Sequence, residues 1–211
     1  FEEAVQAGVT IEKIFALESY RDQLASFPQT VWVSEDILLD LADSQTPQGI
    51  VAVVQKEEVG QADFSQGKFL FLEDVQDPGN VGTIIRTADA AGFTGVIVSE
   101  KSADIYSFKT LRSMQGSHFH LPIYRMSSQS LLEEAKKAAI PVLATTLSKD
   151  SVDYRELVPI ENFVLVMGNE GQGISPLMAE SADQLVHISM KGQAESLNVA
   201  VAAGILIFHL S

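Results

Sequence analysis

Short apolar runs alternate along the chain with stretches in which apolar residues recur every three or four positions. Runs such as 50–54 predict strands, and spacings such as those in 129–139 predict helices. Residues 1–56 therefore predict a small α/β unit. Its expected elements are a helix ending at Gly8, a strand at 11–17, a helix at 20–27, a strand at 30–34, a helix at 35–43 capped by Ser34, and a strand at 49–56.

The second part of the chain shows a longer alternation of the same kind. Residues 57–67 are polar and glycine-containing and follow neither period, so we expect a linker there. Residues 68–211 then predict an α/β domain, in which a mostly parallel sheet carries helices on both faces and binds ligands at the carboxyl ends of its strands. The expected strands are 68–75, 95–100, 121–125, 141–147, 163–168 and 184–189, and the expected helices start at Asn80, near 108, at 129 and at Ser196.

The helix that starts at Asn80 carries an arginine outside its apolar stripe. Val81, Ile84, Ile85 and Ala88 share one side of a 3.6-residue helix, and Arg86 lies almost opposite its centre. We expect the Arg86 side chain to meet water, a ligand or another chain.

A glycine-rich segment follows the strand expected at 163–168. Gly168, Gly171 and Gly173 are expected to adopt positive φ or to approach a ligand closely, although an ordinary sharp turn explains them equally well. A phosphate-binding P-loop is disfavoured, since Ile174 stands where that loop needs lysine. Pro176 occupies the third glycine position of a dinucleotide fingerprint, which disfavours that motif too.

The final helix is expected to be apolar on all sides from Val199 on, which indicates burial by its own domain or by a partner chain. Ser196 and Asn198 stand at its expected start. There they either favour an anion or simply cap the helix.

Composition narrows the classes of partner. The net charge of −14, from 28 acidic and 14 basic residues, repels nucleic acid on average, so a polyanion partner needs a local basic patch. The candidate cations are Arg86, Lys101, Lys109, Arg112, Arg125 and Lys191. The longest apolar run, 199–208, is about half the length of a bilayer span, and cysteine is absent, so we expect a cytoplasmic protein without membrane contact. Phe1 in place of Met suggests a missing start.

Two other chemistries find little support. His118 and His120 alternate like two ligands on a strand, but no cysteine exists and no acidic residue lies at metal-ligand spacing, so no metal is expected. A serine hydrolase is equally disfavoured, because the chain contains no G-x-S-x-G elbow.

Three stretches resemble, in sequence and in order, the signature motifs of the SpoU (TrmH-like) RNA 2′-O-ribose methyltransferases of the SPOUT superfamily. They are DPGNVGTIIRTADAAGF at 77–93, VMGNEGQGIS at 166–175 and HISMKGQAESLNVAVAAGI at 187–205. The resemblance covers residues 68–210 and implies a C-terminal trefoil knot tied around Gly168 to Leu197, which no pattern argument could find. Residues 1–56 resemble the small RNA-binding domain that precedes the catalytic domain in ribosomal-RNA members.

The same resemblance implies a cofactor, a site and a dimer. S-adenosylmethionine is expected on backbone groups of Gly168, Ile188 and Leu197, with Thr145 nearby. The residues expected around the acceptor ribose are Asn80, Arg86, Glu170, Ser196 and Asn198. Family members form homodimers through the knot region and the last helix.

The roles within this site follow partly from chemistry. A guanidinium stays protonated, so Arg86 is expected to clamp a phosphate, in its own site or in that of the other subunit, rather than to act as a base. Glu170 is the more plausible proton acceptor, with hydrogen bonding to Asn80 or to loop amides as an equal alternative.

The expected function is S-adenosylmethionine-dependent methylation of a ribose 2′-hydroxyl in RNA, ribosomal rather than transfer RNA. Three alternatives stay open: a transfer-RNA methyltransferase, a non-catalytic RNA-binding protein that keeps the knotted fold, and an α/β enzyme that acts on a small nucleotide.

Overall fold

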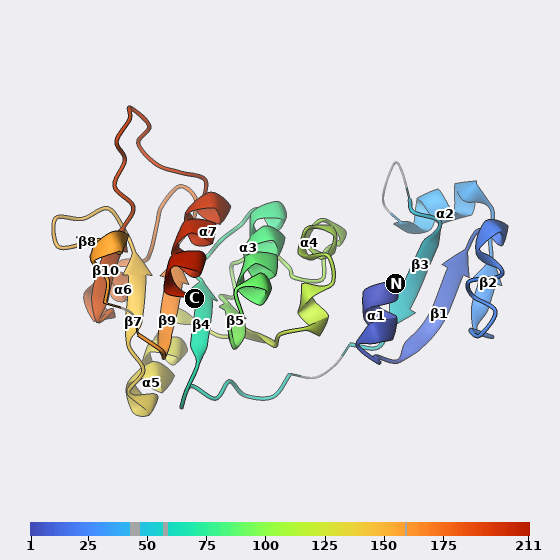
Figure 1. Cartoon of the computed structure of the whole chain (residues 1–211), viewed down its shortest axis with the longest axis horizontal. Coiled ribbons are helices and arrows are strands. Elements are labelled where there is room, and N and C mark those ends of the chain that lie inside the picture. The colour runs from blue at the N-terminus through green and yellow to red at the C-terminus, as the bar shows by residue number, and fades with distance from the viewer. Residues whose placement is uncertain (43–46, 57–58, 159) are drawn as a thin grey trace. The chain divides into compact units, whose positions relative to one another are not determined.

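The chain forms two compact units. The computed structural model describes residues 1–42, 47–56, 59–158 and 160–211, and its contacts divide into Phe1–Glu58 and Val59–Ser211 (Figure 1). Of the expected elements, the end of the helix at Asp43 and the first two linker residues, 57–58, lie outside the described residues.

The first unit contains a three-stranded sheet in the order β2-β1-β3. Strand β1 (Ile11–Ala16) runs parallel to β2 (Thr30–Trp32) and antiparallel to β3 (Ile50–Val54). Helices α1 (Glu2–Gln6) and α2 (Glu35–Ala42) complete it. The alternation in the sequence therefore predicted these strands and both helices.

The helix predicted at 20–27 is wrong. The structure has only the 3₁₀ turn η1 (Glu18–Tyr20), followed by turns up to residue 26. Proline at position 28 disfavours helical backbone at Phe27, and Leu24 is the one fully buried residue of the stretch. A single anchored residue provides no apolar stripe that would hold a helix against the sheet.

The second unit is built on a seven-stranded sheet in the order β6-β5-β4-β9-β7-β10-β8, in which every pair is parallel. This confirms the α/β prediction. The strands are β4 (Lys68–Leu72), β5 (Gly95–Val98), β6 (Ile123–Arg125), β7 (Val142–Thr145), β8 (Val152–Asp153), β9 (Phe163–Met167) and β10 (Gln184–His187). Strand β8 was not predicted, because two residues are too few to show a period.

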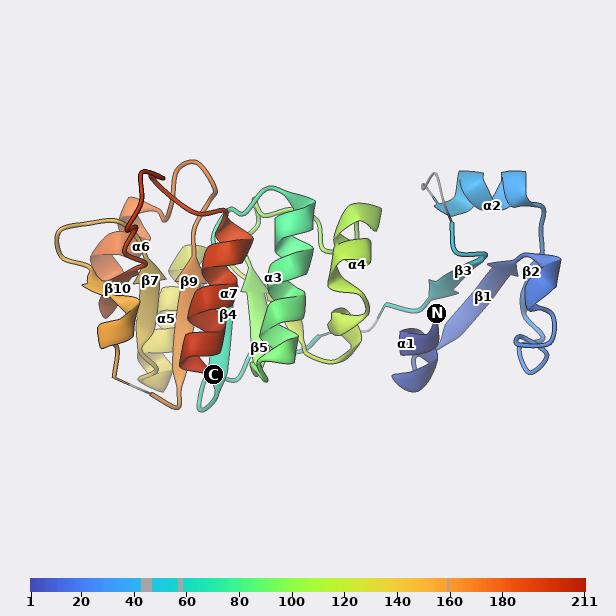
Figure 2. The same ribbon diagram turned by 45° about the horizontal axis from the view of Figure 1, so that its top comes forward.

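Alternate residues of β4 face two different helix layers. Leu70 and Leu72 lie in one apolar cluster with residues of α3 and α7, and Phe69 and Phe71 lie in another with residues of α5 and α6. Helices thus cover both faces, as Figure 2 shows. The bounds are α3 (Pro78–Ala90), α4 (Phe108–Met114), η2 (Ser117–Phe119), α5 (Ser128–Ala138), η3 (Tyr154–Glu156), α6 (Pro176–Ser181) and α7 (Val199–Leu210).

Two helices start at different residues than expected. Helix α3 starts at Pro78, because Asp77 caps it and accepts a hydrogen bond from the Asn80 N–H at 2.9 Å. Helix α7 starts at Val199 rather than at Ser196, because Asn198 is its cap. Ser196 therefore belongs to the preceding loop.

Phe64 changes the picture of the expected linker. Its side chain is buried, and its ring centroid lies 4.8 Å from that of Phe69. The segment before β4 is therefore anchored to the second unit rather than loose throughout.

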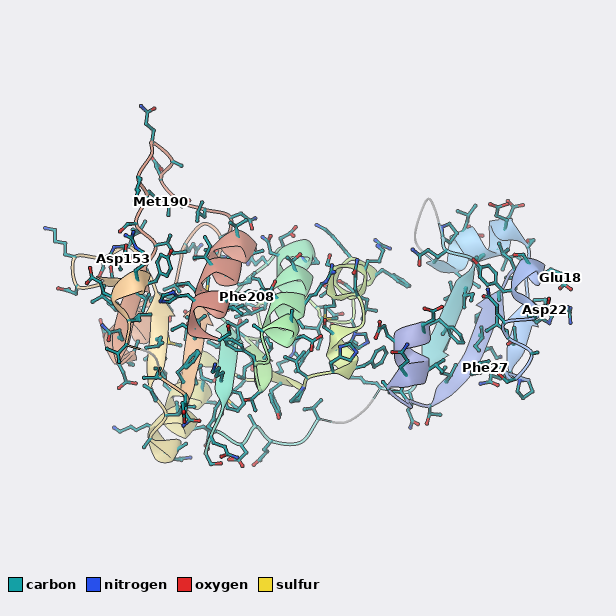
Figure 3. All side chains as sticks on the ribbon, in the orientation of Figure 1. Glu18, Asp22, Phe27, Asp153, Met190 and Phe208 are labelled. Atoms are coloured by element: carbon teal, nitrogen blue, oxygen red, sulfur yellow. The ribbon has the colours of Figure 1, made fainter. Side chains whose placement is uncertain are left out.

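The final helix is buried on one side only within a single chain. Val199, Ala203, Leu206 and Ile207 are in the core, while Val201 is 53% and Phe208 58% exposed. Figure 3 labels Phe208 on this helix. Of the two alternatives for this helix, its own domain does not cover it on every side, so a partner chain is the alternative that stays for the remaining apolar surface of α7. Among the described residues no helix is long and apolar enough to cross a membrane.

Candidate active site

The glycine-rich loop after β9 is a tight hairpin at the carboxyl edge of the sheet. Asn169 and Gly173 exchange two backbone hydrogen bonds of 2.9 Å, and the Asn169 carboxamide oxygen accepts from the N–H groups of Gly171 and Gln172. Only Gly173 of the three glycines expected to need positive φ has it, at 72°. Gly168 is required for a different reason, since a Cβ there would collide with the backbone of Gly173.

A buried carboxylate fastens the end of this loop. Glu73, 3% exposed, follows β4 and accepts hydrogen bonds from the Ser175 N–H at 2.8 Å and from the Ser175 hydroxyl at 2.7 Å. It also accepts from the Ser128 hydroxyl at 2.6 Å. Three donors compensate for removing this carboxylate from water, and they join the glycine loop to the first turn of α5.

Glu170 connects the loop to the start of α3. Its carboxylate accepts from the backbone N–H groups of Gln76 and Asp77, each at 3.2 Å, and from the Asn80 carboxamide at 3.1 Å. The expected hydrogen bond to Asn80 is thus present, and the role of proton acceptor stays a prediction. The backbone amides that Glu170 binds include those of Gln76 and Asp77, directly before α3.

Asn198 brings the third motif to the same place. Its oxygen accepts from the N–H groups of Ala200 and Val201, which is the capping role, while its Nδ2 donates to the Asn80 Oδ1 at 3.1 Å. Asn80, Glu170 and Asn198 therefore form one hydrogen-bonded cluster, although 90 and 118 residues separate the bonded pairs.

Glu170 is ionised at neutral pH in this cluster. Desolvation raises its pKa, but the hydrogen bonds from Asn80 and from the backbone outweigh that effect, so its pKa lies below the usual value. Beside the cluster, at the residue that caps α3, Lys109 forms an ion pair with Asp77 at 2.7 Å and lowers the pKa of that carboxyl.

Arg86 does not join the cluster. It is exposed, as predicted, and no hydrogen bond or ion pair links it to another residue in the described part of the chain. Six residues along a helix correspond to about 9 Å of rise and to a rotation of roughly 240°, so Arg86 points away from Asn80 within one chain. It follows Gly82 by one turn, on the side of α3 that packs against α4.

Three of the four residues expected to hold the cofactor lie at one edge of the sheet. Thr145 ends β7, Gly168 follows β9 and Ile188 follows β10, and these three strands are neighbours. The Thr145 hydroxyl is engaged, since it donates to the Val166 carbonyl at 2.9 Å. No hydrogen bond within the described residues uses the backbone groups of Gly168, Ile188 or Leu197. The segments after β9 and β10 therefore offer unpaired backbone donors and acceptors at this edge, which fits a ligand held by main-chain contacts.

The loop that leads from β10 to α7 is anchored at its base. His187 is hydrogen-bonded to Ser151 at 3.0 Å and to Ser189 at 3.2 Å, on either side of its ring. Figure 3 labels Met190 in this loop and Asp153 on the neighbouring strand β8. Ser196, in the exposed part of the loop, has no hydrogen bond among the described residues, so none links it to the cluster.

Comparison with known protein families shows to which family a chain with this cluster and sheet edge belongs. The profile of the SpoU rRNA methylase family matches residues 67–208, which include the whole cluster. The chain belongs to the SpoU family.

Similarity to individual SpoU proteins extends over both units. The 23S rRNA (guanosine(2553)-2′-O)-methyltransferase RlmP of Bacillus subtilis is 41% identical over 99% of this chain and 84% of its own length. The AdoMet-bound rRNA methyltransferase of Sinorhizobium meliloti superposes with a TM-score of 0.89 at 32% identity, over 99% of this chain and 82% of that one. AviRb of Streptomyces viridochromogenes, solved with AdoMet, has a TM-score of 0.83 at 30% identity, over 99% and 85%.

Several residues that build this SpoU site were not predicted. Asp77 was recognisable, because an acidic residue directly before proline is a typical helix start. Glu73 and Ser175 carried no signal, because a glutamate at a strand end resembles any solvated residue until the chain folds back 102 residues later.

His118 and His120 differ in their surroundings. His120 lies 2.8 Å from Asp89, and the Nδ1 of His118 is buried without a hydrogen-bond partner. Burial lowers the pKa of His118, and His120 nearby adds to this. Within the residues that the structure describes, no group of three or more His, Cys, Asp or Glu side chains is arranged to hold an ion.

Proposed function

We propose that this chain transfers the methyl group of S-adenosylmethionine to a ribose 2′-hydroxyl of ribosomal RNA. The observation that carries this is the cluster of Asn80, Glu170 and Asn198, which unites residues from all three SpoU motifs beside a sheet edge with unpaired backbone groups. The 41% identity to a 23S rRNA 2′-O-methyltransferase over nearly the whole chain supports ribosomal RNA as the substrate class.

The cluster suits the acceptor side of this reaction. S-adenosylmethionine supplies a methyl group on a positively charged sulfur, which a hydroxyl oxygen attacks in line. The Asn80 and Asn198 carboxamides each keep one N–H that the cluster does not use, and the Glu170 Oε2 accepts from Gln76 alone. These groups can orient a ribose hydroxyl, and orientation supplies much of the acceleration in such a transfer.

Glu170 can also receive the proton, provided that transfer is late. A carboxylate with a lowered pKa is too weak a base to ionise a ribose hydroxyl. Once the oxygen has begun to bond to the methyl carbon, however, its proton becomes strongly acidic, and an ionised Glu170 suffices. Activity that depends on ionised Glu170 should therefore persist at acidic pH, down to below the usual carboxyl pKa of about 4.3.

Further parts of the proposal rest on the SpoU resemblance. We assign Gly168, Ile188 and Leu197 to cofactor binding, with Thr145 beside them, and Arg86 to a phosphate of the RNA. Ser196 is kept as an acceptor-side residue that becomes engaged only with substrate. We also propose a trefoil knot formed by the last segments, a homodimer through α7, and RNA binding by the unit before residue 59. The exposed Val201 and Phe208 support the dimer.

Mapping of 2′-O-methylation tests the function directly. Protein-free ribosomal and transfer RNA from a strain lacking this gene are incubated with S-adenosylmethionine and either the wild-type protein or Asn80→Ala. We expect one new methylated ribose in ribosomal RNA with the wild type only. Modification confined to transfer RNA would assign the alternative substrate. Calorimetry in which ATP binds and S-adenosylmethionine does not would instead support a small-nucleotide enzyme.

A further inference from the structure

Two aromatic side chains are exposed beside the candidate active site. Tyr106 is 39% and Phe108 48% exposed, and they flank Ser107 immediately before and at the start of α4. Phe208 on α7 is the other large aromatic residue with comparable exposure in the described part of the chain. Two exposed rings within three residues form a small apolar surface that a flat ligand can cover.

The segment that carries the pair is held firmly. The Ser107 hydroxyl accepts from the Thr110 N–H at 3.3 Å, the Thr110 hydroxyl donates to the Asp104 carbonyl at 2.8 Å, and the Asp104 carboxylate accepts from the Tyr106 N–H at 3.0 Å. The two rings therefore sit on an ordered turn rather than on a loose loop. Preorganised aromatic side chains lose little entropy when they bind a ligand.

This turn is continuous with the catalytic cluster. Lys109, the residue after Phe108, bonds to Asp77, and Asp77 caps the helix turn that contains Asn80. Helices α3 and α4 lie side by side (Figure 2), and a Cβ at Gly82 would lie 2.6 Å from the Thr110 carbonyl. The turn that carries the aromatic pair is thus linked, through Lys109 and Asp77, to the helix turn that contains Asn80.

The charges of the same surface favour a polyanion. Arg86 of α3 and Lys109 and Arg112 of α4 belong to these two adjoining helices, and all three are exposed. Lys109 is already paired with Asp77, whereas Arg86 has no hydrogen bond or ion pair among the described residues, so Arg86 is the cation here that a phosphate can take without displacing a carboxylate. Single-stranded nucleic acid combines stacking bases with phosphates and fits both features.

We propose that Phe108, with Tyr106 beside it, is a stacking subsite for an unpaired RNA base next to the methylated nucleotide. The subsite rests on the proposed function, because it takes the RNA that the enzyme modifies. Phosphates that flank the stacked base would meet the cations of α3 and α4. The ring holds the strand beside the acceptor site and takes no part in methyl transfer.

Steady-state kinetics with ribosomal RNA test the subsite. Loss of one base–aromatic stack corresponds to roughly a 5- to 150-fold change in affinity, so Phe108→Ala should raise the KM for RNA by that factor while kcat and S-adenosylmethionine affinity stay near wild type. Phe108→Leu keeps apolar bulk without a π face and should behave like Phe108→Ala. Phe108→Trp should restore the KM. Recovery by leucine instead would show a plain apolar contact and overturn stacking.

Fluorescence gives a readout that needs no methyl transfer. Trp32 is the single tryptophan, so Phe108→Trp in a Trp32→Phe background places the only indole at the subsite. A short single-stranded RNA should quench it, and the same RNA as a duplex should not. Leu177→Trp in that background is the matched control, since Leu177 is 46% exposed on α6. Equal quenching at both positions, or none at 108, overturns the subsite even if the enzyme methylates RNA. Failure of methylation with selective quenching would overturn the proposed function instead.

Discussion

Glu170 illustrates how a single carboxylate assembles a site from distant segments. It binds two backbone N–H groups and one carboxamide at the start of α3, so it orders the residues it works with. Charge-assisted hydrogen bonds of this kind are stronger than neutral ones. If Glu170 also accepts the proton as proposed, one side chain would both position the site and take part in the reaction.

Removal of acceptor-side groups should affect turnover and spare cofactor binding. Asn80→Ala and Glu170→Ala each delete hydrogen bonds expected to act in the transition state, at a cost on the order of 2 to 4 kcal/mol, or a rate drop of roughly 30- to 1000-fold. Single-turnover methylation and calorimetry with S-adenosylmethionine measure the two effects. Glu180→Gln, an exposed carboxylate on α6, is the control. Near-normal rates in both variants would remove these residues from the chemistry.

Glu73 should contribute to the stability of the fold and hold the end of the glycine-rich loop in place. In Glu73→Gln one acceptor oxygen becomes a donor, so the Ser175 N–H or a hydroxyl loses its partner in a buried place, which costs about 1–3 kcal/mol. Urea denaturation should show this decrease in the free energy of unfolding. Ser128→Ala, which removes a donor and leaves both Ser175 bonds intact, should cost less. Equal losses in the two variants would contradict the special role of the Ser175 contacts.

Only part of this site could be predicted at the residue scale. The family motifs brought Asn80, Glu170 and Asn198 together in the sequence analysis, and their direct bonding is a result of the structure. Glu73 could not be found, because its burial depends on a contact with a residue 102 positions away. Of the two reasons given for Gly168, positive φ is wrong, whereas close approach holds for the backbone of Gly173, which excludes a side chain there.

At the scale of elements, prediction succeeded where a helix or strand was long enough to show a hydrophobic period. The apolar strands β4, β5 and β9 and the amphipathic helix α5 were found, whereas the two-residue β8 and the six-residue α6 were missed. The order of the strands in the sheet could not be predicted from the sequence, for another reason. Strand β9 lies between β4 and β7, so the sheet is not built in chain order, and parallel neighbours are set by long-range packing rather than by local pattern.

The packing of α3 against α4 gives a prediction at this scale. Gly82→Ala would place a Cβ 2.6 Å from both the Ser113 Cβ and the Thr110 carbonyl, so the helices must separate. We expect a loss of roughly 1–3 kcal/mol in unfolding free energy despite the better helix propensity of alanine. Thr83→Ala, on the exposed side of the same helix, should change stability by less than about 0.5 kcal/mol. An unchanged thermal midpoint in Gly82→Ala would show that the helices do not pack this closely.

At the scale of the whole molecule, RNA binding depends on where the positive charges lie and on whether two chains associate. The first unit is strongly acidic, and of its few cations Arg21 is paired with Glu18 and stacked 4.6 Å over Trp32. Phosphate attraction by that unit is therefore weak, and the cations of the second unit carry more of it. A shared active site would add a further cation from a second chain.

The position of Arg86 makes such sharing testable. Within one chain it is about 9 Å along α3 from Asn80 and points elsewhere, while the apolar outer side of α7 offers a surface for a second copy. If a dimer unites Arg86 of one chain with Glu170 and Asn198 of the other, Arg86→Ala and Asn198→Ala should each be inactive. Mixed by unfolding and refolding together, they should form heterodimers in which one site carries both lesions and the other carries neither.

Pairing statistics fix the expected recovery. Half of the dimers in an equal mixture are heterodimers with one intact site of two, so activity should return to about a quarter of wild type per chain. If Arg86 serves its own chain, every site keeps one lesion and no activity returns. Native mass spectrometry must confirm the heterodimers, and refolded wild type sets the reference rate. Heterodimers without recovery would reject the shared site and leave the methyltransferase activity standing, because the cluster of Asn80, Glu170 and Asn198 forms within one chain.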